Sequence, residues 1–97
     1  MAGRVAGKVA LVTGGAMGLG KADCEALARE GATVIVTDRE VELAHKVADS
    51  IGGDAMALDV TSEEQWIEVM RAVKERHGGL DILVNNAGNV IFESIED

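Results

Sequence analysis

The sequence lacks several kinds of residue, and each absence narrows what the chain can be. Its single cysteine, Cys24, excludes a disulfide within the chain and fits a reducing compartment. No apolar run approaches the ~18 residues that span a membrane. The short, mixed start of the chain has no signal-peptide core. We therefore expect no membrane partner and a cytoplasmic location.

Positive charge is also scarce, because 9 Lys and Arg face 17 Asp and Glu and the net charge is −8. Nucleic acids need clustered basic residues, so we expect no nucleic-acid partner. His45 and His77 have no partners at ligand spacing. They are expected at the surface, and no metal site is predicted. With 97 residues the chain makes one domain at most.

Short apolar runs alternate with segments of helical period. The apolar runs predict strands buried on both faces of a sheet, at residues 8–13, 33–37, 55–60 and 82–84. Apolar residues at helical spacing predict helices at residues 18–30, 40–51 and 61–76, each followed by glycine. Thr61 is predicted to cap the third helix by accepting from the amide of Glu64, whose side chain reaches back.

This alternation predicts an α/β fold with a parallel sheet and right-handed crossovers. We expect a Rossmann-type, doubly wound sheet whose first four strands lie in the order 3-2-1-4. Helices one and two then cover one face, and helix three crosses to the other. Such a fold needs more chain, so residues 1–97 are interpreted as a dinucleotide-binding Rossmann domain that is truncated, incomplete at its C-terminus.

A glycine-rich turn, TGGAMGLG, joins the first strand to the first helix at residues 13–20. Gly14 can form the tight turn, and Gly18 and Gly20 let the backbone approach a pyrophosphate and pack the helix on the strand. A pyrophosphate there would face the positive end of the helix. We predict cofactor binding by this turn, including Met17 and Leu19; a glycine-rich turn without a ligand is the alternative.

Asp38 ends the second strand, 18 residues after Gly20. A carboxylate at this place can accept both ribose hydroxyls of an adenosine and repel a 2′-phosphate, which favours NAD over NADP. The alternative is an N-cap of the second helix. Arg39 keeps NADP possible, because a guanidinium can bind a phosphate.

Asp59 and Val60 end the predicted third strand, at the edge where an adenine would lie. Asp59 could instead serve only the start of the third helix. The fourth strand is followed by NNAG, residues 85–88. Asn85 and Asn86 can bond neighbouring strand ends, while Ala87 and Gly88 are small enough for a nicotinamide ribose to lie against the backbone. A plain turn is the alternative here.

The T-G-x-x-x-G-x-G spacing and NNAG together resemble the short-chain dehydrogenase/reductase family, and the resemblance covers residues 7–97. It implies an enzyme that transfers a hydride between NAD or NADP and an alcohol or ketone. It implies that Asp59 bonds the adenine amino group and that Val60 offers its backbone amide. Homo-oligomerisation of the full-length protein is also expected.

The resemblance further implies a catalytic Ser, a Tyr and Lys four residues apart, and an Asn beyond NNAG. The sequence contains no tyrosine, and Asn89 comes too early to be that Asn. We therefore assign no catalytic residue to this chain. A nucleotide-binding module without turnover remains the alternative, and a doubly wound methyltransferase is disfavoured by the two motifs.

Overall fold

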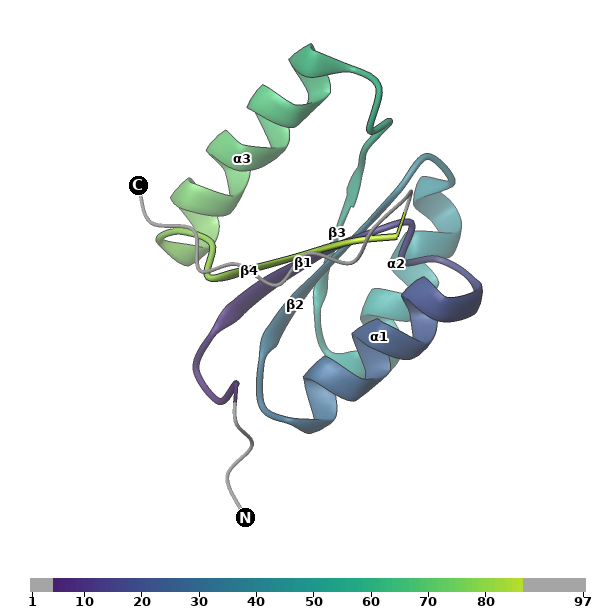
Figure 1. Cartoon of the computed structure of the whole chain (residues 1–97), viewed down its shortest axis with the longest axis vertical. Helices are drawn as coiled ribbons and strands as arrows, with labels where there is room; N and C mark the ends of the chain where they lie inside the picture. The colour runs from purple at the N-terminus through teal and green to yellow at the C-terminus, as the bar shows by residue number, and fades with distance from the viewer. Residues whose placement is uncertain (1–4, 87–97) are drawn as a thin grey trace.

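The computed structural model describes residues 5–86, which form a four-stranded parallel sheet with helices on both faces (Figure 1). The strands are β1 (Val9–Thr13), β2 (Thr33–Asp38), β3 (Asp54–Ala57) and β4 (Ile82–Asn85). Their order is β3-β2-β1-β4, so the predicted fold and strand order are confirmed. The helices are α1 (Gly18–Arg29), α2 (Val41–Ile51) and α3 (Glu63–His77).

Side chains alternate between the two faces of the sheet because successive residues of a strand point in opposite directions. Val12 of β1 and Val36 of β2 lie in the core on the side of α1 and α2. Leu11 and Ile35 lie in the core on the side of α3. The helices are distributed as predicted, with α1 and α2 on one face and α3 on the other (Figure 1).

The predicted apolar stripes of the helices are confirmed. Buried core residues on α1, α2 and α3 include Cys24, Ala44 and Val73. Trp66 and Met70 are partly buried and pack against the core on their side of the sheet. This apolar stripe packs α3 against the sheet. The loop between β3 and α3 therefore lies at the edge of the sheet where the strands end.

The start of α3 and the end of β3 differ from the prediction. The capping residue is Ser62, whose hydroxyl accepts from the amide of Gln65 at 3.2 Å; Thr61 does not cap the helix. The hydroxyl of Thr61 instead donates to Asp59 at 2.6 Å. Strand β3 ends at Ala57, so Asp59 lies in the following loop rather than in the strand.

His77 was expected at the surface, but its side chain is only 19% exposed. Its Nε2 lies 3.2 Å from Asp54 Oδ2. Arg76 Nη1 lies 3.1 Å from the same oxygen. These contacts attach the C-terminal end of α3 to the first residue of β3.

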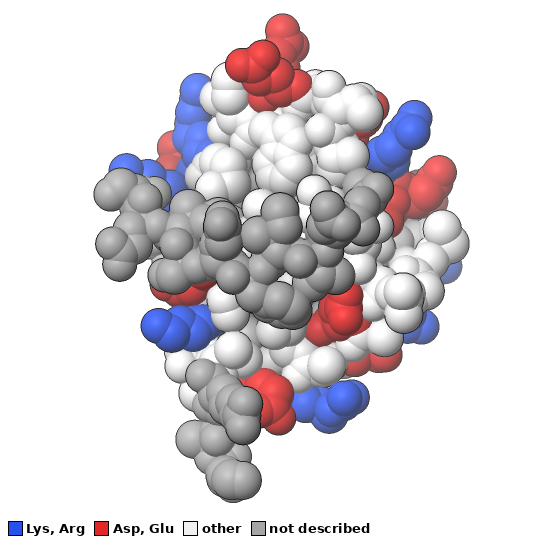
Figure 2. Space-filling model, in the orientation of Figure 1, with Lys and Arg blue, Asp and Glu red and all other residues white. Residues whose placement is uncertain are grey.

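The charged side chains on the face drawn in Figure 2 are mixed in sign, with Lys and Arg interspersed among Asp and Glu on its described part. Among residues 5–86, no helix is long and apolar enough to cross a membrane.

Candidate functional site

A cleft of about 330 Å³ opens at the edge of the sheet where the parallel strands end. Its walls come from the turn after β1, the end of β2, the loop after β3 and the residue after β4. The residues that line it are Gly14, Met17, Leu19, Gly20, Asp38, Arg39, Leu58, Val60 and Asn86. Ligands of open α/β sheets bind at this edge, where the strand order reverses.

Seven of the eleven predicted cofactor-binding residues line this cleft: Gly14, Met17, Leu19, Gly20, Asp38, Val60 and Asn86. Gly18 and Asp59 are not among the lining residues, although each is adjacent in sequence to residues that are. Ala87 and Gly88 lie outside the described residues. Leu58, a buried side chain after β3, lines the cleft and was missed by sequence reasoning, because one apolar residue in a strand-like run carries no mark of a site.

The turn after β1 is packed so closely that side chains larger than hydrogen are excluded at two positions. A Cβ on Gly20 would overlap the carbonyl group of Gly14, which has a left-handed φ of +63°. A Cβ on Gly15 would come within 2.9 Å of Val36 and 3.0 Å of the Cys24 sulfur. The role of Gly15 was not predicted; it lets helix α1 and the turn settle directly on β2. Close packing therefore fixes the start of α1 at the cleft.

The N-terminal end of α1 carries no acidic group in its first turn, and its N-cap residue, Met17, makes no side-chain capping bond. Helix α3 differs, because Ser62 caps it and Glu63 and Glu64 occupy its first turn. The partial positive charge of the α1 terminus is thus not neutralised by its own first turn. Leu19 is 80% exposed here, an apolar side chain beside the free end of the helix.

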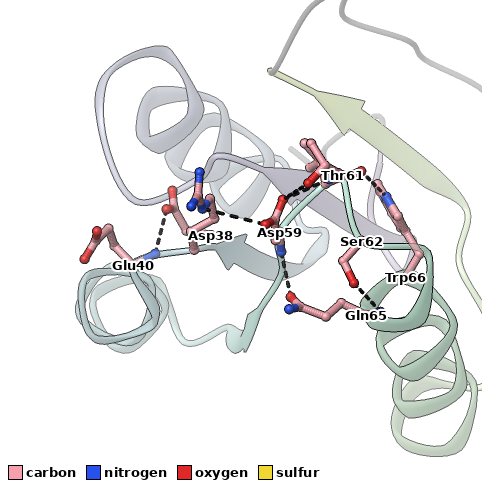
Figure 3. A network of polar contacts seen from close by, with 9 residues as sticks. Asp38, Glu40, Asp59, Thr61, Ser62, Gln65 and Trp66 are labelled. Atoms are coloured by element: carbon pink, nitrogen blue, oxygen red, sulfur yellow. Dashed lines mark hydrogen bonds and ion pairs between the residues drawn. The ribbon is translucent and has the colours of Figure 1, made fainter.

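Two backbone hydrogen bonds hold the carboxylate of Asp38 in place, and Figure 3 shows the one from Glu40. Oδ1 accepts from the amide of Glu40 at 2.9 Å, and Oδ2 accepts from the amide of Ala16 at 3.2 Å. The second bond ties the end of β2 to the turn after β1. Each carboxylate oxygen accepts about two hydrogen bonds, so acceptor capacity remains for hydroxyl donors in the cleft.

Asp59 lies at the neighbouring strand end, between Asp38 and Thr61 in Figure 3. Its Oδ1 accepts from the amide of Thr61 at 2.9 Å and from the Thr61 hydroxyl. These bonds from Thr61, with a smaller contribution from the positive charge of Arg39, lower the pKa of the Asp59 carboxyl from 3.8. The Asp59 carboxylate is therefore ionised at neutral pH.

The two asparagines at the end of β4, Asn85 in the strand and Asn86 directly after it, bond the end of β1, as predicted. Asn86 Nδ2 donates to the carbonyl oxygen of Thr13 at 3.0 Å, and the Asn86 amide donates to the Thr13 hydroxyl at 3.1 Å. That hydroxyl donates in turn to Asn85 Oδ1 at 3.1 Å. These bonds hold the ends of β1 and β4 together and place Asn86 in the wall of the cleft.

Comparison with known proteins finds a large group of relatives of this chain. Residues 8–97 match the family model of the short chain dehydrogenases. The chain is 46% identical, over 98% of its length, to a cyclopentanol dehydrogenase of Comamonas sp. (strain NCIMB 9872). It is 39% identical, over all of its length, to an NADP-dependent (R)-specific alcohol dehydrogenase of Lentilactobacillus kefiri.

Among solved structures, the chain matches one titled ribose-5-phosphate isomerase from Brucella melitensis 16M, with 41% identity and a TM-score of 0.85. That match covers 91% of this chain and 34% of the other. The chain spans about 40% of the length of the two dehydrogenases. The likeness therefore concerns the part of each protein that aligns with β1 to β4 and the residues just after them.

Proposed function

The chain belongs to the short-chain dehydrogenase family, and from this we propose that residues 1–97 form the nucleotide-binding part of an NAD(P)-dependent oxidoreductase. The whole protein would transfer a hydride between the nicotinamide cofactor and an alcohol or ketone. The observation that carries the proposal is the cleft at the strand ends, which combines an uncapped helix terminus with a fixed carboxylate.

The residues of the cleft suit a dinucleotide in their chemistry. The turn has glycine at residues 14, 15, 18 and 20, where the backbone can approach a pyrophosphate, and the α1 terminus offers amides and positive charge. Asp38 has acceptor capacity left for the ribose hydroxyls. Leu58 and Val60 give the adenine an apolar wall. Each part of the adenosine half thus finds a suitable surface.

The nicotinamide half is assigned to the region after β4. Asn86 lines the cleft on that side, and Ala87 and Gly88 follow it in the sequence. Bound there, the nicotinamide ring supplies hydride transfer. The part played by this chain is to bind and orient the dinucleotide, and to exclude water with Met17 and Leu19 at the mouth of the cleft.

The acid–base chemistry is assigned to the rest of the whole protein, because these 97 residues contain no tyrosine. The same absence favours the second candidate, a module that binds the nucleotide without turnover. We propose NAD rather than NADP as the cofactor, since Asp38 would oppose a 2′-phosphate at the ribose. The substrate is proposed only as an alcohol or ketone.

The proposal is tested by titrating the chain with NADH and NADPH and following nicotinamide fluorescence. We expect NADH to bind more tightly. Asp38→Ala should weaken NADH binding at least tenfold, because bonds to a charged acceptor contribute about 1.5–3 kcal/mol. Asp49→Ala, which removes an exposed carboxylate on α2, is the matched control and should leave both affinities unchanged.

Other outcomes separate the alternatives. Tighter binding of NADPH than of NADH would make the assignment of NAD wrong. Binding of ribose 5-phosphate without binding of either dinucleotide would favour an activity like the one named for the Brucella melitensis protein over an oxidoreductase. A folded chain that binds none of these ligands would contradict the proposed cleft.

A further inference from the structure

Arg39 presents a difficulty for an NAD-binding site. It follows Asp38 directly and lines the same cleft. Its side chain is 76% exposed. An exposed guanidinium beside the carboxylate proposed to bind the ribose is suited to bind a 2′-phosphate, because guanidinium and phosphate form paired, charge-assisted hydrogen bonds. Arg39 alone would therefore weaken the preference that Asp38 creates.

The structure shows Arg39 engaged by a second carboxylate. Arg39 Nε lies 4.0 Å from Asp59 Oδ2, and this contact joins the residue after β2 to the loop after β3. Asp38 itself is bonded to the amides of Ala16 and Glu40. Of the two acidic groups at these strand ends, it is Asp59 that pairs with the guanidinium.

Asp59 is well anchored for this task. Its Oδ1 is held by the amide and hydroxyl of Thr61. Its own amide donates to Gln65 Oε1 at 2.7 Å, on the first turn of α3. Oδ2 is left to face Arg39. The bonds to Thr61 and Gln65 thus fix the Asp59 carboxylate, whereas the Arg39 side chain is largely exposed.

We propose that Asp59 determines cofactor specificity through Arg39: it occupies the guanidinium that would otherwise bind a 2′-phosphate, and so preserves the preference for NAD. This inference rests on the proposed function, since it concerns the adenosine half of the same cleft. Asp59 is a positioning residue in this role. Asp59 Oδ2 would also accept a hydrogen bond from the adenine amino group, which both cofactors carry.

The test is a double-mutant cycle with Asp59→Asn, Arg39→Gln and the double variant. The measured quantity is the ratio of the dissociation constants for NADPH and NADH, in which the adenine contact common to both cofactors cancels. Asparagine keeps the Oδ1 acceptor for Thr61 and removes the charge that holds Arg39. The chain's unfolding transition, followed by circular dichroism, checks that each variant is folded.

We expect Asp59→Asn to lower the NADPH/NADH ratio about threefold to tenfold, the range set by an exposed ion pair and the loss of one nearby charge. In the Arg39→Gln background the same substitution should change the ratio less than twofold. The effect should shrink in high salt, which screens exposed charges. With lysine in place of Arg39, Asp59→Asn should again lower the NADPH/NADH ratio, by less than it does with arginine.

Two results would overturn the inference alone: an unchanged ratio in Asp59→Asn, or an equal change with and without Arg39. The second would mean that Asp59 repels the phosphate directly. Failure of both dinucleotides to bind the folded chain would overturn the proposed function and this inference together. A check without nucleotide is the NMR titration of the Asp59 carboxyl, which should occur at higher pH in Arg39→Gln; an unchanged titration would also contradict the pairing.

Discussion

Replacing Gly20 by alanine tests the close packing on which the whole site depends. Gly20 is the third residue of α1 and is buried. Its added methyl group would overlap the carbonyl carbon and oxygen of Gly14. These are backbone atoms of a turn that cannot yield easily, because the amide of Gly15 is bonded to the carbonyl of Thr37 at 3.0 Å. Helix and turn must therefore move apart.

The magnitude follows from two opposing contributions. Overpacking of a well-packed site costs about 1–3 kcal/mol, and contact with fixed backbone belongs in the upper part of that range. Alanine returns at most about 1 kcal/mol through its better helix propensity. Gly20→Ala should therefore lower the free energy of unfolding by about 2 kcal/mol. For a chain of this size that corresponds to a fall in Tm of about 8–16 °C.

The assay is thermal and urea unfolding followed by circular dichroism, with Gly18→Ala as the matched control. Gly18 has a left-handed φ of +58°, but a methyl group there would meet no atom within 4 Å. The control should cost only the strain of a left-handed alanine, about 1 kcal/mol. If Gly20→Ala were no less stable than Gly18→Ala, the overlap with Gly14 would not exist and the described turn would be wrong.

Three further substitutions test contacts on the α3 side of the sheet. Desolvation raises the pKa of Asp54, but bonds from His77, Arg76 and the Ala55 amide, and the charge of Arg76, outweigh it, so the pKa lies below 3.8. A lowered pKa stabilises the fold above pH 3.8, and that contribution is lost as the pH falls through the lower folded-state value. Asp54→Asn should thus cost about 1 kcal/mol at pH 7, and the difference from the parent should vanish in strong acid; a constant difference in urea unfolding across this range would refute the assignment. Ser62→Ala should lower the free energy of unfolding by about 1 kcal/mol through loss of the α3 cap, and Thr61→Ala by less than half of that. A larger loss in Thr61→Ala than in Ser62→Ala would show that Thr61 caps α3, as predicted from the sequence.

The fold was predictable because its signals are repeated along the chain. Strands β1, β2 and β4 are apolar runs that contain β-branched residues, β3 is a weaker apolar run, and each helix shows an apolar stripe followed by glycine. The cap of α3 was misplaced because two adjacent sequences fit the same motif. Thr61 with Glu64 and Ser62 with Gln65 have the same spacing. Only the path of the chain after β3, where Thr61 turns to Asp59, decides between them.

The site was predictable where topology alone determines it. The residues that follow parallel strands meet at one edge of the sheet. The strand order alone therefore predicts that the turn at Gly14 lies near Asp38 and Asn86. Pairings across that edge could not be predicted in the same way. The contact of Arg39 with Asp59 depends on side-chain directions from two loops, and no periodic pattern encodes them.

Asp38 shows why the choice between a structural and a functional role can be a false one. From the sequence, an N-cap of α2 and a ribose acceptor were alternatives. In the structure Glu40, not Asp38, is the N-cap of α2. One oxygen of Asp38 accepts from the Glu40 amide, and the other accepts from the Ala16 amide in the glycine-rich turn. Those bonds fix the carboxylate without exhausting its lone pairs. A structural role that immobilises a carboxylate beside a cleft prepares it to bind, because the ligand does not have to order it first.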